Sequence, residues 1–177
     1  MIAAPGFLPL ANIMQIAWIT PDMERSLEQF RSQYQVPEFL VTEHTFPAEV
    51  FGRQGEISLL VALANVDAMQ LELIQPLGGN DSIYRDVLPA DGSHANVFHH
   101  VCVKIYGPLA NWDAHIAALG PHQPIVYSGD VGPDARFVYT DLRASLGMYL
   151  EHVWFGEETE ARMAAAVPTY RSRWQQE

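Results

Sequence analysis

One order of sequence elements occurs twice along the chain, and this repeat restricts the possible folds more than any other feature. The apolar, β-branched run at residues 13–19 predicts a strand. Thr20-Pro21-Asp22 then predicts a helix start, with Thr20 as the N-cap, Pro21 at the first helical position and Asp22 in the first turn. The helix itself is indicated by an apolar stripe at helical spacing, formed by Met23, Leu27, Phe30 and Tyr34. Three strand-like runs follow, at residues 38–46, 56–64 and 68–75. The first half therefore predicts the order strand, helix, strand, strand, strand.

The second half predicts the same order after a turn-rich break at residues 76–82 and a short helical run at 82–88. A strand is expected at 97–105, and Gly107-Pro108 begins a helix. The apolar stripe of this helix consists of Leu109, Trp112, Ile116 and Leu119. Three short strands are then expected, at residues 123–129, 135–141 and 147–155.

Corresponding residues of the two halves lie at similar separations. Gln15 and His100 are 85 positions apart, Glu72 and Glu151 are 79 apart, and Pro21 and Pro108 are 87 apart. Near-equal separations combined with a matching element order indicate an internal duplication. We therefore expect an α+β fold with two βαβββ modules, at residues 12–78 and 96–155, within a single domain spanning 1–177. Residues 156–177 are expected to form a C-terminal helical tail that Pro168 interrupts.

The composition restricts the partners and the compartment. Hydrophobic residues make up 49% of the chain, which is typical of a globular protein, and the formal net charge is −11. This charge argues against nucleic acid or an anionic membrane surface as a partner, because both require clustered cations, and it suits a cationic ligand or a bound metal. Cys102 is the only cysteine, and no Lys or Arg precedes Arg25, so no secretory signal is indicated. A cytoplasmic protein is expected.

Each half carries one polar residue capable of binding a metal in its first strand and another in its last strand. These residues are Gln15 and Glu72 in the first half, and His100 and Glu151 in the second. The alternation of a strand places Leu71 and Leu73 on the face opposite Glu72, where a helix would cover them. If the halves close together, the other face encloses two carboxylates, an amide and an imidazole. A divalent cation would relieve the repulsion between two buried carboxylates.

Each of these residues also has a structural interpretation. Gln15 taken alone is a common type of polar strand residue, and Glu72 could face solvent on a half-exposed sheet.

The set of four potential ligands lacks a thiolate, which favours Zn, Ni, Co, Mn or Mg as the bound metal, with Fe less expected. His99 neighbours His100 in the same strand, so we expect it to point to the opposite face and to have a structural or supporting role.

Several quoted stretches resemble the vicinal oxygen chelate superfamily, in its glyoxalase-like branch. They are QIAWITPDMERSLEQF, LELIQPLGG, DSIYRDVL, HHVCV and LGMYLEHV, and the resemblance covers residues 12–155. It implies two βαβββ modules that form a curved sheet around a metal cavity. It also implies metal ligands on the first and last strand of each module, which are Gln15, Glu72, His100 and Glu151 in this chain. By analogy with modules that pair between chains, a homodimer is expected.

The activity implied by the resemblance is that of an isomerase, epimerase or lyase acting on a small-molecule substrate. A divalent ion would stabilise an enediolate or enolate while a carboxylate removes the proton next to the carbonyl. Glu151 is our choice for this base, with Glu72 as its catalytic partner across the metal. Two alternatives stay open: an extradiol Fe(II) ring-cleaving dioxygenase, and a metal-free binding protein of the bleomycin-resistance type. Gln15 counts against the dioxygenase, because that site uses a second histidine.

Six further residues are candidates for contact with the substrate. Tyr84 and Arg85 are expected near the mouth of the cavity, whereas Arg136, Tyr139 and Tyr149 are expected to line it. Cys102 lies two residues after His100 and therefore shares its face. Cys102 either lines the pocket or serves as a small buried hydrophobic residue, the more common role of a lone cysteine.

Overall fold

The computed structural model describes residues 8–129 and 131–173. Residues 1–7, 130 and 174–177, which include both ends of the expected domain and the end of the expected tail, lie outside the described residues. The elements of the first half are β1 (Ile13–Ile19), α1 (Met23–Tyr34), β2 (Leu40–Val50), β3 (Arg53–Val66), β4 (Met69–Gly79) and α2 (Ser82–Arg85). Those of the second half are β5 (Val97–Lys104), α3 (Leu109–Ala118), β6 (Ile125–Gly129), β7 (Ala135–Leu142), α4 (Arg143–Leu146) and β8 (Met148–Phe155). The chain continues with α5 (Glu157–Ala166) and β9 (Thr169–Tyr170).

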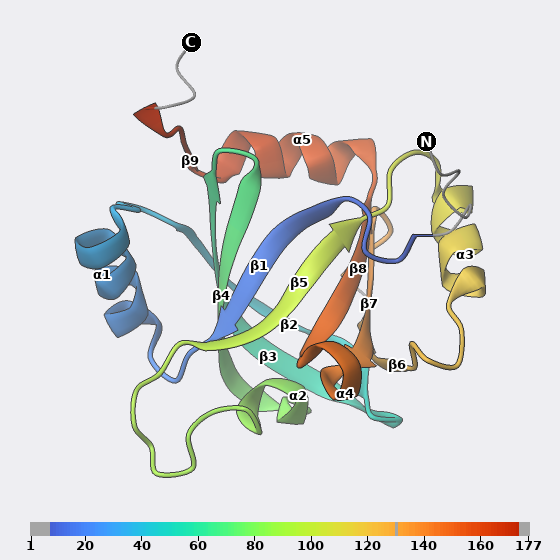
Figure 1. The fold of residues 1–177 in the computed structure, drawn as a ribbon, viewed down its shortest axis with the longest axis horizontal. Helices are drawn as coiled ribbons and strands as arrows, with labels where there is room; N and C mark the ends of the chain where they lie inside the picture. The colour runs from blue at the N-terminus through green and yellow to red at the C-terminus, as the bar shows by residue number, and fades with distance from the viewer. Residues whose placement is uncertain (1–7, 130, 174–177) are drawn as a thin grey trace.

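The strands form one strongly curved sheet that closes on itself (Figure 1). Its order is β2-β6-β7-β8-β5-β1-β4-β3-β9, and β2 also pairs with β3. The joint between the two halves on this side is short, because β2 meets β6 only through Ala48, Glu49 and Val50. Closure leaves a barrel interior that the strands surround, with β9 attached to the end of β3. The expected curved sheet of an α+β fold is confirmed.

The first and last strands of the two halves lie side by side in the middle of the sheet. β1 is parallel to β4, β5 is parallel to β8, and β1 and β5 are antiparallel to each other. In this register Ala17 is opposite Glu72, and Cys102 is opposite Glu151. Ala17 and Cys102 are themselves 85 positions apart, the separation of Gln15 and His100. The pairing therefore reproduces in space the equivalence that the sequence indicates.

Helices cover the outer face of the barrel, and side chains fill much of its interior. On the outer face Leu73 of β4 packs with Met23 and Phe30 of α1, and α3 contributes Trp112 to a cluster with Val138 and Trp154. Leu73 thus occupies the face expected for it, opposite Glu72. Inside the barrel, the largest cluster contains four buried tyrosines, Tyr84, Tyr127, Tyr139 and Tyr149.

The C-terminal segment crosses one end of the barrel, whereas α2 lies at the other end (Figure 1). α5 ends before Pro168, as expected, because proline cannot continue a helix. The segment beyond it does not return to helix: Pro168 and Tyr170 accept backbone hydrogen bonds from Asn65 and Asp67, and β9 joins β3. No helix within the described ranges is both long and apolar enough to span a bilayer.

Candidate metal centre

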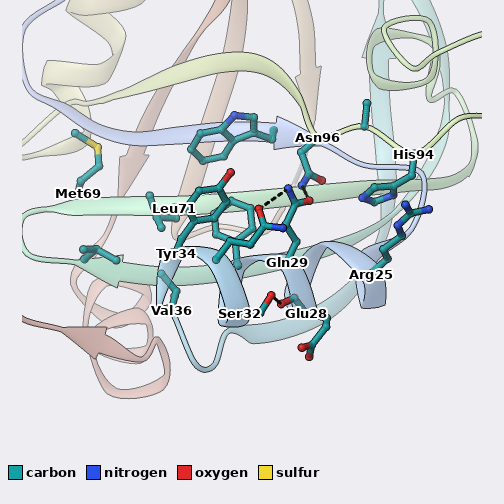
Figure 2. A pocket seen from close by; sticks show the side chains of 15 residues that line it. Arg25, Glu28, Gln29, Ser32, Tyr34, Val36, Met69, Leu71, His94 and Asn96 are labelled. Atoms are coloured by element: carbon teal, nitrogen blue, oxygen red, sulfur yellow. Dashed lines mark hydrogen bonds between the residues drawn. The ribbon is translucent and has the colours of Figure 1, made fainter.

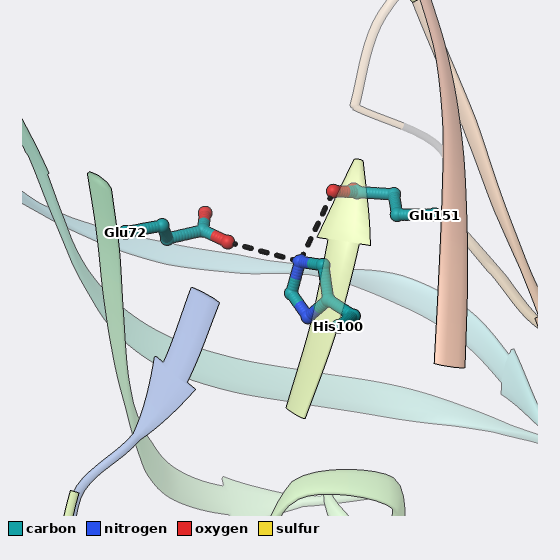
Figure 3. A group of neighbouring side chains, drawn as sticks. All are labelled: Glu72, His100 and Glu151. Atoms are coloured by element: carbon teal, nitrogen blue, oxygen red, sulfur yellow. Dashed lines mark ion pairs between the residues drawn. The ribbon is translucent and has the colours of Figure 1, made fainter. Parts of the chain in front are cut away.

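Three side chains meet inside the barrel, each from a different central strand (Figure 3). His100 of β5 lies between Glu72 of β4 and Glu151 of β8, and its Nε2 is 3.2 Å from Oε2 of each glutamate. One potential ligand atom from each residue lies within 4.8 Å of the others. His100 is fully buried, and the two glutamate side chains are each 12% exposed. The described residues contain no second group of this kind.

The strand register explains why these three residues meet. β1 runs between β4 and β5, and its Ala17 is opposite both Glu72 and His100. Residues paired across a sheet project to the same face, so any side chain at position 17 would stand between these two. Alanine is small enough to let the glutamate and the imidazole approach above it.

The electrostatics of this cluster are those of a cation site. Burial acts to lower the pKa of His100, but its interactions with Glu151 and Glu72 outweigh this effect and raise the pKa to about 9. Burial raises the pKa of Glu72, although His100 opposes that shift. Apart from its ion pair with His100, Oε2 of Glu72 has no partner among the described residues. Two carboxylates and one imidazole are donors that a divalent ion such as Zn, Ni, Co or Mn accepts, so the residues fit a bound metal.

His99 does not point away from His100 as the alternation of a strand predicts. Ala17 pairs with His100, but Trp18 pairs with Phe98, so His99 is an extra residue in a β-bulge. The bulge brings the two rings together, with their Nδ1 atoms 2.9 Å apart. Burial, followed by the proximity of His100, lowers the pKa of His99 to about 3. The sequence carries no local sign of this bulge.

Gln15 lies at the same cavity as the two glutamates. This cavity has a volume of about 190 Å³, and Gln15, Glu72 and Glu151 all line it. The side-chain amide of Gln15 donates from Nε2 to Oε1 of Gln70 (3.0 Å), and Gln70 donates to Asn65 (3.1 Å). This chain of amides leaves Oε1 of Gln15 as the atom available to a cation.

The walls of the cavity include residues that the sequence did not single out as site residues. They are Met14, His44, Val61, Leu63, Gln70, Phe137, Val153, Phe155 and Met163. Gln70 was detectable in principle, because it lies two positions before Glu72 in the same strand. His44 and Met163 come from β2 and α5, and only the closure of the barrel and the path of the C-terminal segment bring them here.

The six candidate substrate residues form three groups: one cysteine at the cavity, three tyrosines beside the histidines, and two arginines outside the cavity. Cys102 lines the cavity and is buried, and burial together with Glu151 raises the pKa of its thiol. The hydroxyl of Tyr139 lies 3.3 Å from Nε2 of His100 and accepts a hydrogen bond from the hydroxyl of Tyr84. Tyr149 lies against the ring of His99, with 4.7 Å between the ring centroids. These tyrosines therefore contact the histidines rather than the walls of the cavity.

The two arginines lie elsewhere. Arg85 is half exposed and pairs with Asp81, the residue that precedes its own short helix. Arg136 donates to the backbone oxygens of Gly132, Pro133 and Ala135. Neither arginine is among the residues that line the cavity.

A larger hollow of about 880 Å³ lies on the outer face, between α1 and the sheet (Figure 2). Tyr34 and Leu71 line it, as does His94. Leu71 and Glu72 are neighbours in one strand and project to opposite faces. The sheet itself therefore separates this hollow from the cluster that Glu72 forms with His100 and Glu151.

The comparisons with known proteins agree with this geometry. The model of the Glyoxalase/Bleomycin resistance protein/Dioxygenase superfamily matches residues 14–139, whereas no curated protein matches the sequence significantly. A solved methylmalonyl-CoA epimerase in complex with methylmalonyl-CoA and NH4+ is similar at 22% identity and a TM-score of 0.51, over 82% of this chain and 95% of that one.

Two other solved epimerases give the same result. A Streptomyces coelicolor methylmalonyl-CoA epimerase variant is similar at 22% identity and a TM-score of 0.52, over 82% of this chain and 95% of its own. The enzyme from Mycobacterium tuberculosis is 14% identical with a TM-score of 0.52, over 90% and 97% of the two chains. Likeness at this level shows a shared fold. Taken with the family match over most of its length, it shows that the chain belongs to the Glyoxalase/Bleomycin resistance protein/Dioxygenase superfamily, which is the vicinal oxygen chelate superfamily.

Proposed function

We propose that this chain is a metal-dependent isomerase, epimerase or lyase that removes a proton next to the carbonyl group of a small molecule. The observation that carries the proposal is the buried group of Glu72, His100 and Glu151, which strands β4, β5 and β8 hold together. These residues and Gln15 would hold a divalent ion. When bound, such an ion would supply a Lewis acid for the substrate oxygens.

The two glutamates are suited to proton transfer on opposite sides of a substrate. They come from equivalent strands, and each lies 3.2 Å from the same histidine nitrogen. We assign proton removal to Glu151 and the partner role to Glu72. Moving a proton from one face of a carbon to the other requires two such groups, whereas lysis or a shift along one face requires one. This arrangement favours epimerisation over lysis or an isomerisation along one face.

The cavity limits which part of a substrate reaches these carboxylates. Its volume of about 190 Å³ is below the roughly 300–1,000 Å³ typical of sites that enclose a drug-sized ligand. Among the residues that the structure describes, neither Lys nor Arg lines it. Because the cavity is small, the part of the substrate that enters it must also be small. Because no Lys or Arg of the described residues lines the cavity, a bound metal would be the cation that pairs with the substrate oxygens. The neighbouring epimerases act on a CoA ester. In this chain only the acyl end of such an ester would fit beside the glutamates, so short 2-oxo and 2-hydroxy carbonyl compounds are equally good candidates.

The first test is metal content. The purified chain is stripped with a chelator, reconstituted separately with Zn, Ni, Co, Mn and Mg, and analysed for bound ion. We expect one divalent ion per chain. If none of the five ions binds stoichiometrically, the proposal is wrong.

The second test follows proton abstraction directly. Methylmalonyl-CoA and a panel of short carbonyl compounds are incubated in D2O with the reconstituted chain, and NMR measures deuterium uptake at the carbon next to the carbonyl. Glu151→Gln should lower the exchange rate by roughly 10²–10⁴-fold. Glu43→Gln, a change at an exposed position of β2, serves as the matched control and should not change the rate. Catechol turnover with added Fe(II), or ligand binding that needs no metal, would instead support one of the two alternatives.

A further inference from the structure

His99 holds the ring of His100 on the side away from the glutamates. Nδ1 of His100 lies 2.9 Å from Nδ1 of His99, and Nε2 of His99 lies 3.0 Å from the backbone oxygen of Ile83. His99 and His100 are 3% and 0% exposed. Water therefore does not compete for these nitrogens, and every proton in the chain of contacts has a protein partner.

The carbonyl of Ile83 decides where those protons lie. A carbonyl oxygen only accepts hydrogen bonds, so Nε2 of His99 carries a proton and donates it. In a neutral imidazole the other nitrogen then has a lone pair, and Nδ1 of His99 is an acceptor. The neighbouring Nδ1 of His100 must therefore be the donor. This leaves Nε2 of His100 as the nitrogen that faces Glu72 and Glu151.

The short helix α2 leaves the backbone oxygen of Ile83 available to accept the hydrogen bond from His99. It spans only Ser82–Arg85. The backbone N–H groups of Tyr84 and Arg85 donate to the oxygen of Asp81, and that of Asp86 donates to the oxygen of Ser82. The oxygen of Ile83 is thereby free to accept from His99. The ring of Tyr149 lies against His99 and limits its rotation.

We propose that His99 is a positioning residue of the metal centre, which fixes His100 in the tautomer protonated on Nδ1 and so keeps Nε2 as the ligand atom. The inference rests on the proposed function, because it assigns His99 a role toward a metal. Metal-binding histidines are commonly held in this way by an acceptor behind the ring, and loss of such a partner costs roughly 10–100-fold in metal affinity. Here the acceptor is the adjacent residue of the same strand, which only the bulge makes possible.

Two variants separate the hydrogen bond from the packing. His99→Phe keeps a ring but removes the acceptor, whereas His99→Asn is smaller and supplies Oδ1 near the position of the lost Nδ1. His115→Phe is the matched control, because it removes one ring from the other histidine pair, His115 and His152 (2.8 Å), on the outer face. Zn(II) and Co(II) affinities are measured by competition with a chromogenic chelator.

We expect His99→Phe to bind both ions about 10–100-fold more weakly than the native chain. His99→Asn should stay within a few-fold of the native value, and His115→Phe should not change it. Native-like binding by His99→Phe overturns the proposal, and so does equal loss in His99→Phe and His99→Asn, which would show a packing role only. If His99→Phe does not fold, a more than tenfold loss in His99→Asn likewise overturns the proposal.

A measurement on the native chain is independent of the variants. Nitrogen-15 NMR of the histidine rings should show His99 protonated on Nε2 and a scalar coupling between the two Nδ1 nuclei across their hydrogen bond. A proton on Nδ1 of His99 would overturn the inference even if the metal binds. Failure of the native chain to bind any divalent ion would overturn the proposed function, and with it the metal role of His99. Binding that is equal in the native chain and His99→Phe would overturn the inference alone.

Discussion

The buried cluster predicts that the chain without metal loses stability as the pH rises above neutrality. Between its two glutamates, His100 has a pKa of about 9 in the folded chain, against 6.5 for an ordinary histidine. A raised pKa means that folding favours the protonated form. The resulting stabilisation is complete below about pH 6.5 and disappears as the pH rises through 9. The raised pKa of Glu72 acts in the same direction, because its protonated form is also favoured in the folded chain.

The size of the effect follows from the shift of His100. A shift from 6.5 to about 9 corresponds to roughly 3 kcal/mol of unfolding free energy at about 1.4 kcal/mol for each pH unit. His100 is fully buried, so solvent screening does not reduce this value. We therefore expect the unfolding free energy to fall by about 3 kcal/mol between pH 6 and pH 9.5 through this residue.

Urea denaturation in the presence of excess chelator measures the effect at half-unit steps of pH. The matched comparison is His100→Gln, which removes the titrating ring and keeps a polar side chain of similar length. The difference between the two pH profiles above pH 6.5 should show the loss, since the titrating groups away from the cluster are common to both. Parallel profiles would refute the reasoning, because they would show that His100 is not held as a cation between the glutamates. With saturating zinc the trend should reverse, because the ion replaces the proton on Nε2 and binds more tightly as the pH rises.

Three further predictions concern residues around the cluster. Gln15→Ala should weaken zinc binding by about tenfold or more if Oε1 is a ligand, and an unchanged affinity in chelator competition would remove Gln15 from the ligand set. Met163→Ala should cost only about 1 kcal/mol of unfolding free energy, because Met163 is half-buried, and it should raise kcat/KM for bulkier substrates about tenfold; unchanged selectivity would show that α5 does not limit substrate size. His152 has its pKa lowered to about 3 by burial and by His115. It should therefore reduce the unfolding free energy by about 1.4 kcal/mol for each pH unit below 6.5, and the slope measured by urea denaturation should decrease by this amount in His152→Asn.

The sequence by itself determined the repeated element order and the residues that define it. The periodicity of residues 13–19 and 68–75 reflects burial on one or both faces of a strand, which is a local property of the chain. The order of elements and the equivalence of Gln15 with His100 can therefore be recognised from the sequence alone. Helix starts are less exact: the side chain of Asp22, not Thr20, caps α1 by accepting from the backbone of Arg25. Several residues in this stretch are capable of capping, and the packing of the helix selects among them.

Only the tertiary structure decided which polar residues meet. The position of Ala17 between Glu72 and His100 depends on strand pairing across the two halves, which no local pattern encodes. The bulge at His99 reverses the direction that alternation predicts for that ring, because one extra residue changes the face of a side chain. Arg85 and Arg136 are engaged with Asp81 and with backbone oxygens, and the polar face of a helix or strand does not reveal such local partners. Residues close in sequence share their periodicity, whereas a cavity is formed by residues that are distant in sequence, so its walls follow from the closure of the barrel and the path of α5.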